Sequence, residues 1–138
     1  MKKNDKGFSL IELIIVIAIM AVLVAIIAPN LTKYLGQSKK NTDIANMDTV
    51  KEIIEQACAL SGVECSEPQN LDTWVELKED SAYYDSDGAD VNGYLSFGRY
   101  VASVMGDVPV SKQNGKNFEV KISGSSGGRY TVEVRVKS

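Results

Sequence analysis

An uninterrupted apolar run near the start of the chain constrains its fold more than any other feature. The run covers sixteen consecutive residues, from Leu13 to Ala28. Together with Leu10 to Glu12 it makes a nineteen-residue segment, which as a helix is about 29 Å long and matches the ~30 Å hydrocarbon core of a bilayer. A core helix of a soluble protein keeps polar residues at a helical period, and a cleaved secretory signal has a shorter apolar core. We therefore expect a membrane-spanning helix.

The rest of the chain has the composition of an ordinary domain with a polar surface. Of 138 residues 44 % are hydrophobic, and positions 8–28 hold nineteen of these. The mean hydropathy of −0.08 therefore averages a membrane-like segment with a more polar remainder. The absence of histidine excludes a Ser-His-Asp triad and a His-ligated zinc site, and the net charge of −3 argues against a nucleic-acid partner. We predict no cofactor and no enzymatic activity, because no pattern selects two carboxylates for glycoside hydrolysis and the sequence has no phosphate-binding loop.

A carboxylate, Glu12, lies directly before the apolar run. A charged side chain inside a membrane segment costs up to a few kcal/mol, so Glu12 requires a partner. A simple single-span anchor explains the apolar run but not this carboxylate. The flanking lysines do not fix the orientation of the run, because three precede it and three follow it closely: Lys2, Lys3 and Lys6, then Lys33, Lys39 and Lys40.

The segment Lys6-Gly7-Phe8-Ser9-Leu10-Ile11-Glu12, followed by the apolar run and Pro29, resembles the class III signal of type IV pilins and their pseudopilin relatives. The rest of the chain resembles these proteins only in layout, a long helix followed by a β-rich head. The resemblance implies cleavage after Gly7 by a prepilin peptidase and N-methylation of the new N-terminus, Phe8. It also implies that Glu12 neutralises the Phe8 amine of a neighbouring subunit, since opposite charges attract strongly in an apolar filament core.

The same resemblance implies a function and a location. The precursor crosses the cell membrane once and then polymerises with identical subunits into an extracellular filament, built by inner-membrane machinery with a cytoplasmic ATPase. We therefore interpret the chain as a structural subunit of a type IV pilus that serves adhesion, surface motility or biofilm formation. Two alternatives stay open: a pseudopilin of a type II secretion or DNA-uptake machine, and a singly anchored surface binding module.

We expect one helix from about Ser9 to Leu60, bent near Pro29, because proline removes a backbone donor and clashes with the preceding turn. Beyond Pro29, apolar residues recur every three or four positions, as on one face of an amphipathic helix: Ile44, Met47, Val50, Ile53, Ile54, Ala57 and Cys58. Charged residues fall largely on the other faces: Asp43, Asp48, Lys51, Glu52 and Glu55. Ser61-Gly62 provides a C-terminal stop. The resemblance implies that Pro29 to Gly36 unwinds on assembly.

A small antiparallel sheet is predicted near the C-terminus. Apolar and polar residues alternate in two segments that a glycine-rich turn separates: Phe118, Val120 and Ile122, then Tyr130, Val132, Val134 and Val136. We also expect a short helix after Asn70, with Trp74 in the core, and a further strand within Tyr94–Met105. The fold class is therefore α+β, a long kinked N-terminal helix packed on a small antiparallel β-sheet head. Its expected parts are a leader at 1–7, a transmembrane half-helix at 8–28, an amphipathic half-helix at 29–60 and a globular head at 61–138.

The head contains two further candidate sites. Cys58 and Cys65 are the only cysteines. A cell-surface location permits a disulfide between them, and two free thiols are the alternative. Asp85, Asp87 and Asp90 have oxygen ligands for calcium, but their loop lacks the bidentate glutamate of an EF-hand, so we predict a solvated turn and no metal.

Overall fold

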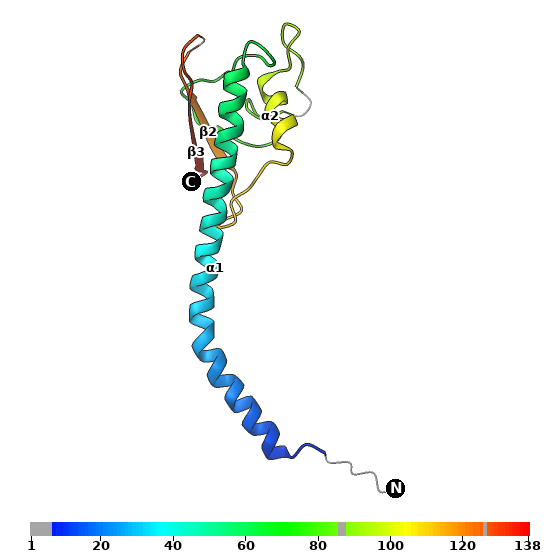
Figure 1. Ribbon diagram of the computed structural model, residues 1–138, viewed down its shortest axis with the longest axis vertical. Helices are drawn as coiled ribbons and strands as arrows, with labels where there is room; N and C mark the ends of the chain where they lie inside the picture. Colours follow the sequence, from blue (N-terminus) through cyan, green and yellow to red (C-terminus); the bar gives the residue numbers. More distant parts are fainter. Residues whose placement is uncertain (1–6, 86–87, 126) are drawn as a thin grey trace, which may run out of the picture. The chain divides into compact units, whose positions relative to one another are not determined.

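The computed structural model describes residues 7–85, 88–125 and 127–138 of the chain. Five elements follow one another within these ranges: α1 (Leu10–Leu60), β1 (Val75–Glu76), α2 (Phe97–Met105), β2 (Phe118–Ser123) and β3 (Thr131–Val136) (Figure 1). The chain divides into two compact units, Met1–Ser38 and Lys39–Ser138, so α1 contributes to both.

In the first unit, every described residue is exposed along the apolar part of α1. The helix begins at Leu10, within one residue of the predicted start, and continues through Pro29. Within the described ranges, α1 is the one helix long and apolar enough to cross a membrane, judged by length and composition alone. The bend at Pro29 stays a prediction.

In the second unit, the C-terminal half of α1 packs on the head through Val50, Ile54, Ala57 and Cys58, which are all buried. Their spacing of three or four residues places them on one face, as predicted, whereas Ile44 of the same predicted face is 47 % exposed. The head contributes apolar and aromatic residues to the same cluster: Leu77, Tyr83, Tyr84, Phe97, Tyr100, Val101, Val120, Ile122 and Val132. Burying one side chain such as Ile54 contributes about 1.5–3 kcal/mol, so this helix face holds the head to α1.

The predicted antiparallel hairpin is confirmed. The three strands form one sheet in the order β1-β2-β3, and each neighbouring pair is antiparallel. Apolar residues of β2 face apolar residues of β3 across the ladder, with Phe118 opposite Val136 and Ile122 opposite Val132. Phe118, Val120 and Ile122 of β2 are buried, which gives the sheet one face in the core.

The other face of the sheet is charged and internally paired. Glu119 lies opposite Arg135, and Lys121 lies opposite Glu133. The Arg135 Nε to Glu119 Oε2 distance is 2.8 Å, and the Lys121 Nζ to Glu133 Oε1 distance is 3.6 Å. The Arg135 guanidinium carbon lies 3.9 Å from the centroid of the Trp74 ring, a cation–π contact. This face is therefore suited to contact with water.

The prediction of a short helix after Asn70 with Trp74 in the core is wrong. Asn70 and Asp72 have φ of +56° and +61°, in the left-handed region that a right-handed helix does not use. The chain turns here and continues into β1, whose Val75 pairs with Val120. Trp74 is half-buried against the charged face of the sheet, where its ring contacts Arg135.

The strand predicted within Tyr94–Met105 is also wrong, because this segment forms α2. Ser96 caps the helix: its Oγ accepts a hydrogen bond from the backbone N–H of Arg99 at 3.3 Å. The buried residues of α2 include positions with helical spacing: Phe97, Tyr100 and Val101. The Ser96 cap and the helical spacing of the buried residues explain why this segment is a helix and not a strand.

The predicted end of α1 is confirmed, but the position of Asp43 is not as predicted. The helix ends at Leu60, and Gly62 adopts φ of +78° as its N–H donates to the Cys65 carbonyl at 2.8 Å. Asp43, expected on an exposed face, is only 1 % exposed. It is buried because the loop at 111–113 donates hydrogen bonds to its carboxylate, an arrangement we call the Asp43 clasp.

Candidate processing and assembly site

Glu12 stabilises the N-terminus of α1. Glu12 Oε2 accepts a hydrogen bond from the backbone N–H of Ser9 at 2.8 Å. Ser and Glu at this spacing are typical of a capping box, and an acidic side chain in the first turn also complements the helix dipole. Glu12 therefore has a partner within its own chain, which the spacing Ser9-x-x-Glu12 could have indicated.

Gly7 and Phe8 precede the helix in non-helical conformation. Both are exposed, Phe8 to 88 %, and a Cβ added at Gly7 would meet nothing within 4 Å. Exposed backbone outside regular structure is where proteases cut most readily. The Gly7–Phe8 peptide bond therefore meets the steric requirement of the predicted cleavage. The rest of the predicted leader, residues 1–6, lies outside the described residues.

An apolar surface extends along the first half of α1. Its exposed large side chains include these residues: Leu10, Ile11, Leu13, Ile14, Ile15, Val16, Ile17, Ile19, Met20, Val22, Leu23, Val24, Ile26, Ile27, Leu31 and Leu35. Soluble monomers rarely expose a contiguous apolar patch of this size, which marks a surface that binds lipid or protein. This surface requires an apolar partner outside the chain.

Pro29 and Gly36 lie inside α1, where they weaken the helix. Side chains next to Pro29 bind backbone carbonyls of the same helix. The Asn30 amide donates to the Ile26 carbonyl at 3.4 Å, and the Thr32 hydroxyl donates to the Pro29 carbonyl at 3.0 Å. Unwinding of this stretch on assembly stays a prediction.

Both cysteines of the head are free and buried in the structure. Cys65 Sγ lies 3.5 Å from the Ala57 carbonyl oxygen as a weak donor. Burial, together with the neighbouring Cys65 and Glu55, raises the pKa of Cys58 to about 12, so its thiol is protonated at neutral pH. The disulfide between Cys58 and Cys65 stays a prediction.

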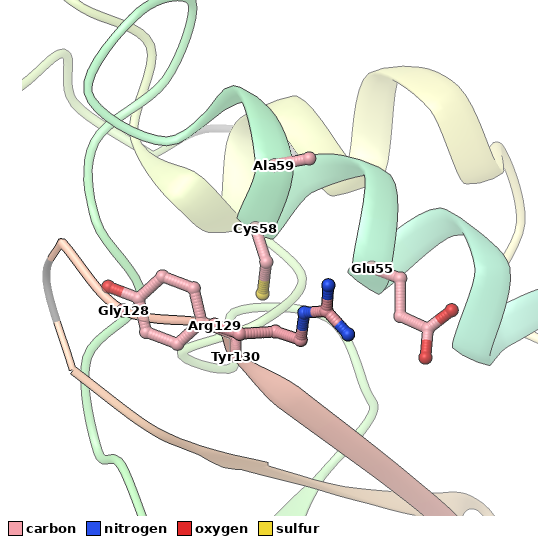
Figure 2. Close-up of a pocket in the computed structure, with 6 residues that line it drawn as sticks. All are labelled: Glu55, Cys58, Ala59, Gly128, Arg129 and Tyr130. Atoms are coloured by element: carbon pink, nitrogen blue, oxygen red, sulfur yellow. The ribbon is translucent and has the colours of Figure 1, made fainter.

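The surface of the head has open hollows. One of about 460 Å³ lies between the end of α1 and the start of β3, with these residues around it: Glu55, Cys58, Ala59, Gly128, Arg129 and Tyr130 (Figure 2). Figure 2 shows the Cys58 sulfur directed toward the strand side of the hollow. A protonated thiol with one carboxylate and one guanidinium does not make a nucleophile–base pair.

The acidic loop was the weak candidate for calcium. Asp87 lies outside the described residues. Asp90 forms an ion pair with Arg99, with 2.8 Å between Oδ1 and Nη1. Across the described ranges, no three His, Cys, Asp or Glu side chains are grouped so as to hold a metal ion.

Comparison with known proteins supports the identification of the N-terminal motif. Residues 2–28 match the prokaryotic N-terminal methylation motif. The chain is 39 % identical over 67 residues to the type IV major fimbrial protein FimA of Dichelobacter nodosus, covering 49 % of this chain and 42 % of FimA. It is 37 % identical over 81 residues to the type IV wide pilus major component PilA4 of Thermus thermophilus, covering 50 % and 62 % of the two chains.

A third relative is the prepilin peptidase-dependent protein A of Clostridium perfringens, 36 % identical over 66 residues and matched over 47 % of each chain. The chain thus spans about half the length of the curated relatives it matches. No solved structure matches it significantly. The methylation motif and these relatives support a type IV pilin.

Proposed function

We propose that this protein is a structural subunit of a type IV pilus, which polymerises through α1 into an extracellular filament. The observation that carries the proposal is the exposed apolar surface of α1. Most of this surface lies within residues 2–28, which match the methylation motif. Neighbouring copies of the same helix supply the apolar partner that this surface requires. Two of the relatives are named as a major fimbrial protein and a major pilus component, which agrees with the proposal.

Processing comes first in this proposal. A prepilin peptidase cuts the exposed Gly7–Phe8 bond, and Phe8 becomes the methylated N-terminus. Before assembly, the apolar part of α1 anchors the protein in the cell membrane. Inner-membrane machinery with a cytoplasmic ATPase then moves the subunit into the growing filament, which extends outside the cell.

Glu12 sets the height at which a subunit enters the filament. In the single chain its carboxylate accepts one hydrogen bond, from Ser9 at 2.8 Å, so further acceptor capacity stays available. In the filament that capacity meets the Phe8 amine of a neighbouring subunit. Two opposite charges in an apolar core attract strongly, whereas either one alone is heavily penalised. Only subunits at the correct height satisfy both charges.

The head faces water in the proposed filament. The charged face of the sheet carries the ion pairs Glu119–Arg135 and Lys121–Glu133, and it needs no protein partner. Adhesion, surface motility and biofilm formation are the roles we propose for the filament.

Electron microscopy of material sheared from the cell surface tests the proposal. An antibody raised against the head should decorate long filaments along their whole length. Filaments without label, or label confined to the cell body, would contradict a structural role in the pilus. Processed protein without long filaments would instead indicate a pseudopilin.

A further inference from the structure

The head contains two Asn-Gly pairs, and the structure holds them in different ways. The pairs are Asn92-Gly93 and Asn114-Gly115, and all four residues are exposed. An asparagine side chain is least stable when glycine follows it, because a residue without a side chain leaves its backbone nitrogen open to approach the asparagine amide. Since both pairs have the same sequence, a difference in their reactivity in the folded protein comes from the structure around them.

The first pair forms the centre of a tight turn. Asn92 and Gly93 have φ of +52° and +84°, as the two central residues of a type I′ turn require. The Val91 N–H donates to the Tyr94 carbonyl at 2.8 Å, and the Tyr94 N–H donates to the Val91 carbonyl at 2.9 Å. Among the described residues, neither the Gly93 N–H nor the Asn92 side-chain amide takes part in a hydrogen bond. Both groups are therefore unprotected.

This turn can open without disturbing the core of the head. The bridge between Val91 and Tyr94 is isolated, so it is not part of a longer ladder. Both of these residues are exposed, Val91 to 37 % and Tyr94 to 42 %. A Cβ added at Gly93 would meet nothing within 4 Å, so the backbone has room to move. Short isolated hairpins open readily, and such an opening lets the Asn92 backbone rotate.

The second pair is held in place by hydrogen bonds. The Gly115 N–H donates to the Ser111 carbonyl at 2.8 Å, which occupies the backbone nitrogen of this pair. Asn114 Oδ1 accepts from the backbone N–H of Lys116 at 3.0 Å. The same loop is bound to α1 by the Asp43 clasp, so its rotation requires the loss of hydrogen bonds to a buried carboxylate.

We propose that Asn92 is a site of spontaneous deamidation in the folded protein, and that the Asp43 clasp protects Asn114 from the same reaction. The Gly93 backbone nitrogen loses its proton and attacks Cγ of Asn92. The bond from Cγ to the side-chain nitrogen breaks, and the amide group takes up a proton and leaves as ammonia. Water then opens the succinimide ring, at Cγ to give aspartate or at the backbone carbonyl to give isoaspartate. Water is the only co-reactant, and the proposal does not depend on the proposed function.

The reaction changes the surface of the head at one defined place. Asn92 lines an open hollow of about 450 Å³, and Glu67 is the one charged residue among the described residues that line it. Both products add a second carboxylate there. Isoaspartate also lengthens the backbone by one methylene group, which does not fit a two-residue turn. The converted fraction therefore increases with the age of the folded chain and gives this hollow a more acidic form.

Peptide mass spectrometry of the full chain, kept folded in detergent at mildly alkaline pH, tests the proposal. Deamidation replaces NH₂ with OH, so each converted peptide gains mass. We expect Asn92 to convert at least about tenfold faster than Asn114, because the hydrogen bonds of the second pair and the clasp lower the population of open loops. Conversion of Asn114 as fast as Asn92 would overturn the proposal. So would the absence of conversion at Asn92 over the time in which the unfolded chain converts.

Two controls assign the difference to the fold and to Asn92. In guanidinium chloride both pairs lose their hydrogen bonds, so Asn92 and Asn114 should convert at similar rates, and a difference as large as in the folded chain would overturn the proposal. Asn92→Gln should remove the more acidic form that isoelectric focusing detects in stored protein, because the longer side chain closes a ring far more slowly. Persistence of that form would contradict the assignment to Asn92.

Variants of the clasp test the protection of Asn114. Asp43→Ala should bring the conversion rate of Asn114 close to that of Asn92, which keeps its own rate. The matched control Asp48→Ala, on the same helix, should change neither rate. If Asp43→Ala does not fold, Ser111→Ala replaces it, because it removes the 2.6 Å hydrogen bond from the hydroxyl to the Asp43 carboxylate. Unchanged protection of Asn114 in a folded clasp variant would contradict the role of the clasp.

Discussion

Replacing Asp43 with alanine removes the acceptor of four hydrogen bonds, and the structure allows the cost to be worked out. A hydrogen bond to a charged group contributes about 1.5–3 kcal/mol, and a buried donor left without a partner costs about 1–3 kcal/mol. The backbone amides of Lys112 and Gln113 can regain water, because these residues are exposed. The hydroxyl of Ser111, which is 2 % exposed, cannot do so without movement of the loop. We expect the free energy of unfolding to fall by about 3 kcal/mol.

Thermal unfolding of the full chain in detergent, followed by circular dichroism, measures this loss. In a domain of about 100 residues each kcal/mol corresponds to roughly 4–8 °C, so Tm should fall by more than about 10 °C. The matched control is Asp48→Ala, an exposed carboxylate on the same helix, which should change the free energy of unfolding by less than about 0.5 kcal/mol. The same Tm for both variants would refute the reasoning that the clasp stabilises the head.

Three further predictions follow from particular residues. Burial raises the pKa of Asp43, but the hydrogen bonds from the loop outweigh burial and hold the pKa below its ordinary value. The clasp should therefore stabilise the fold above about pH 4, and the stability difference between the wild type and Asp43→Asn should shrink as the pH falls below that value; a constant difference down to low pH would contradict this. Glu12→Ala should prevent filament formation, scored by shearing and immunoblotting, without stopping cleavage after Gly7, and normal filaments would contradict the role of Glu12. Chains isolated without reductant should carry a Cys58–Cys65 disulfide, seen as a mass lower by two hydrogens, and alkylation of both cysteines after unfolding without reductant would exclude it.

The parts of the fold that the sequence predicts are those with a simple period. The spacing of Val50, Ile54 and Ala57 predicts the buried face of α1, and alternation predicts the hairpin of β2 and β3. In both cases one face is buried and the other is exposed to water, so the pattern of hydrophobic residues alone is enough to predict the element and its buried face.

The parts that the sequence does not predict depend on specific hydrogen bonds or on short segments. Asp43 is a charged residue, so its burial cannot be inferred without knowing that donors nearly seventy residues later reach it. In α2, the choice of helix over strand depends on the cap at Ser96, which the apolar pattern of a nine-residue segment does not reveal. Trp74 lies on the charged face because Arg135 covers its ring, a contact between distant parts of the chain.

In the candidate site, the sequence predicts roles for Gly7, Phe8 and Glu12, and the structure adds the local arrangement of these residues. The hydrogen bond from Ser9 to Glu12 begins the helix just after the proposed cleavage point.

In the proposed function, the chain is processed after Gly7 and assembled through α1. Mass spectrometry of the N-terminal peptide of protein recovered from sheared filaments tests it most directly. We expect a chain that begins at Phe8 and carries a methyl group on its amine. A chain that begins at Met1, or one cut beyond Ala28 by an ordinary signal peptidase, would contradict it.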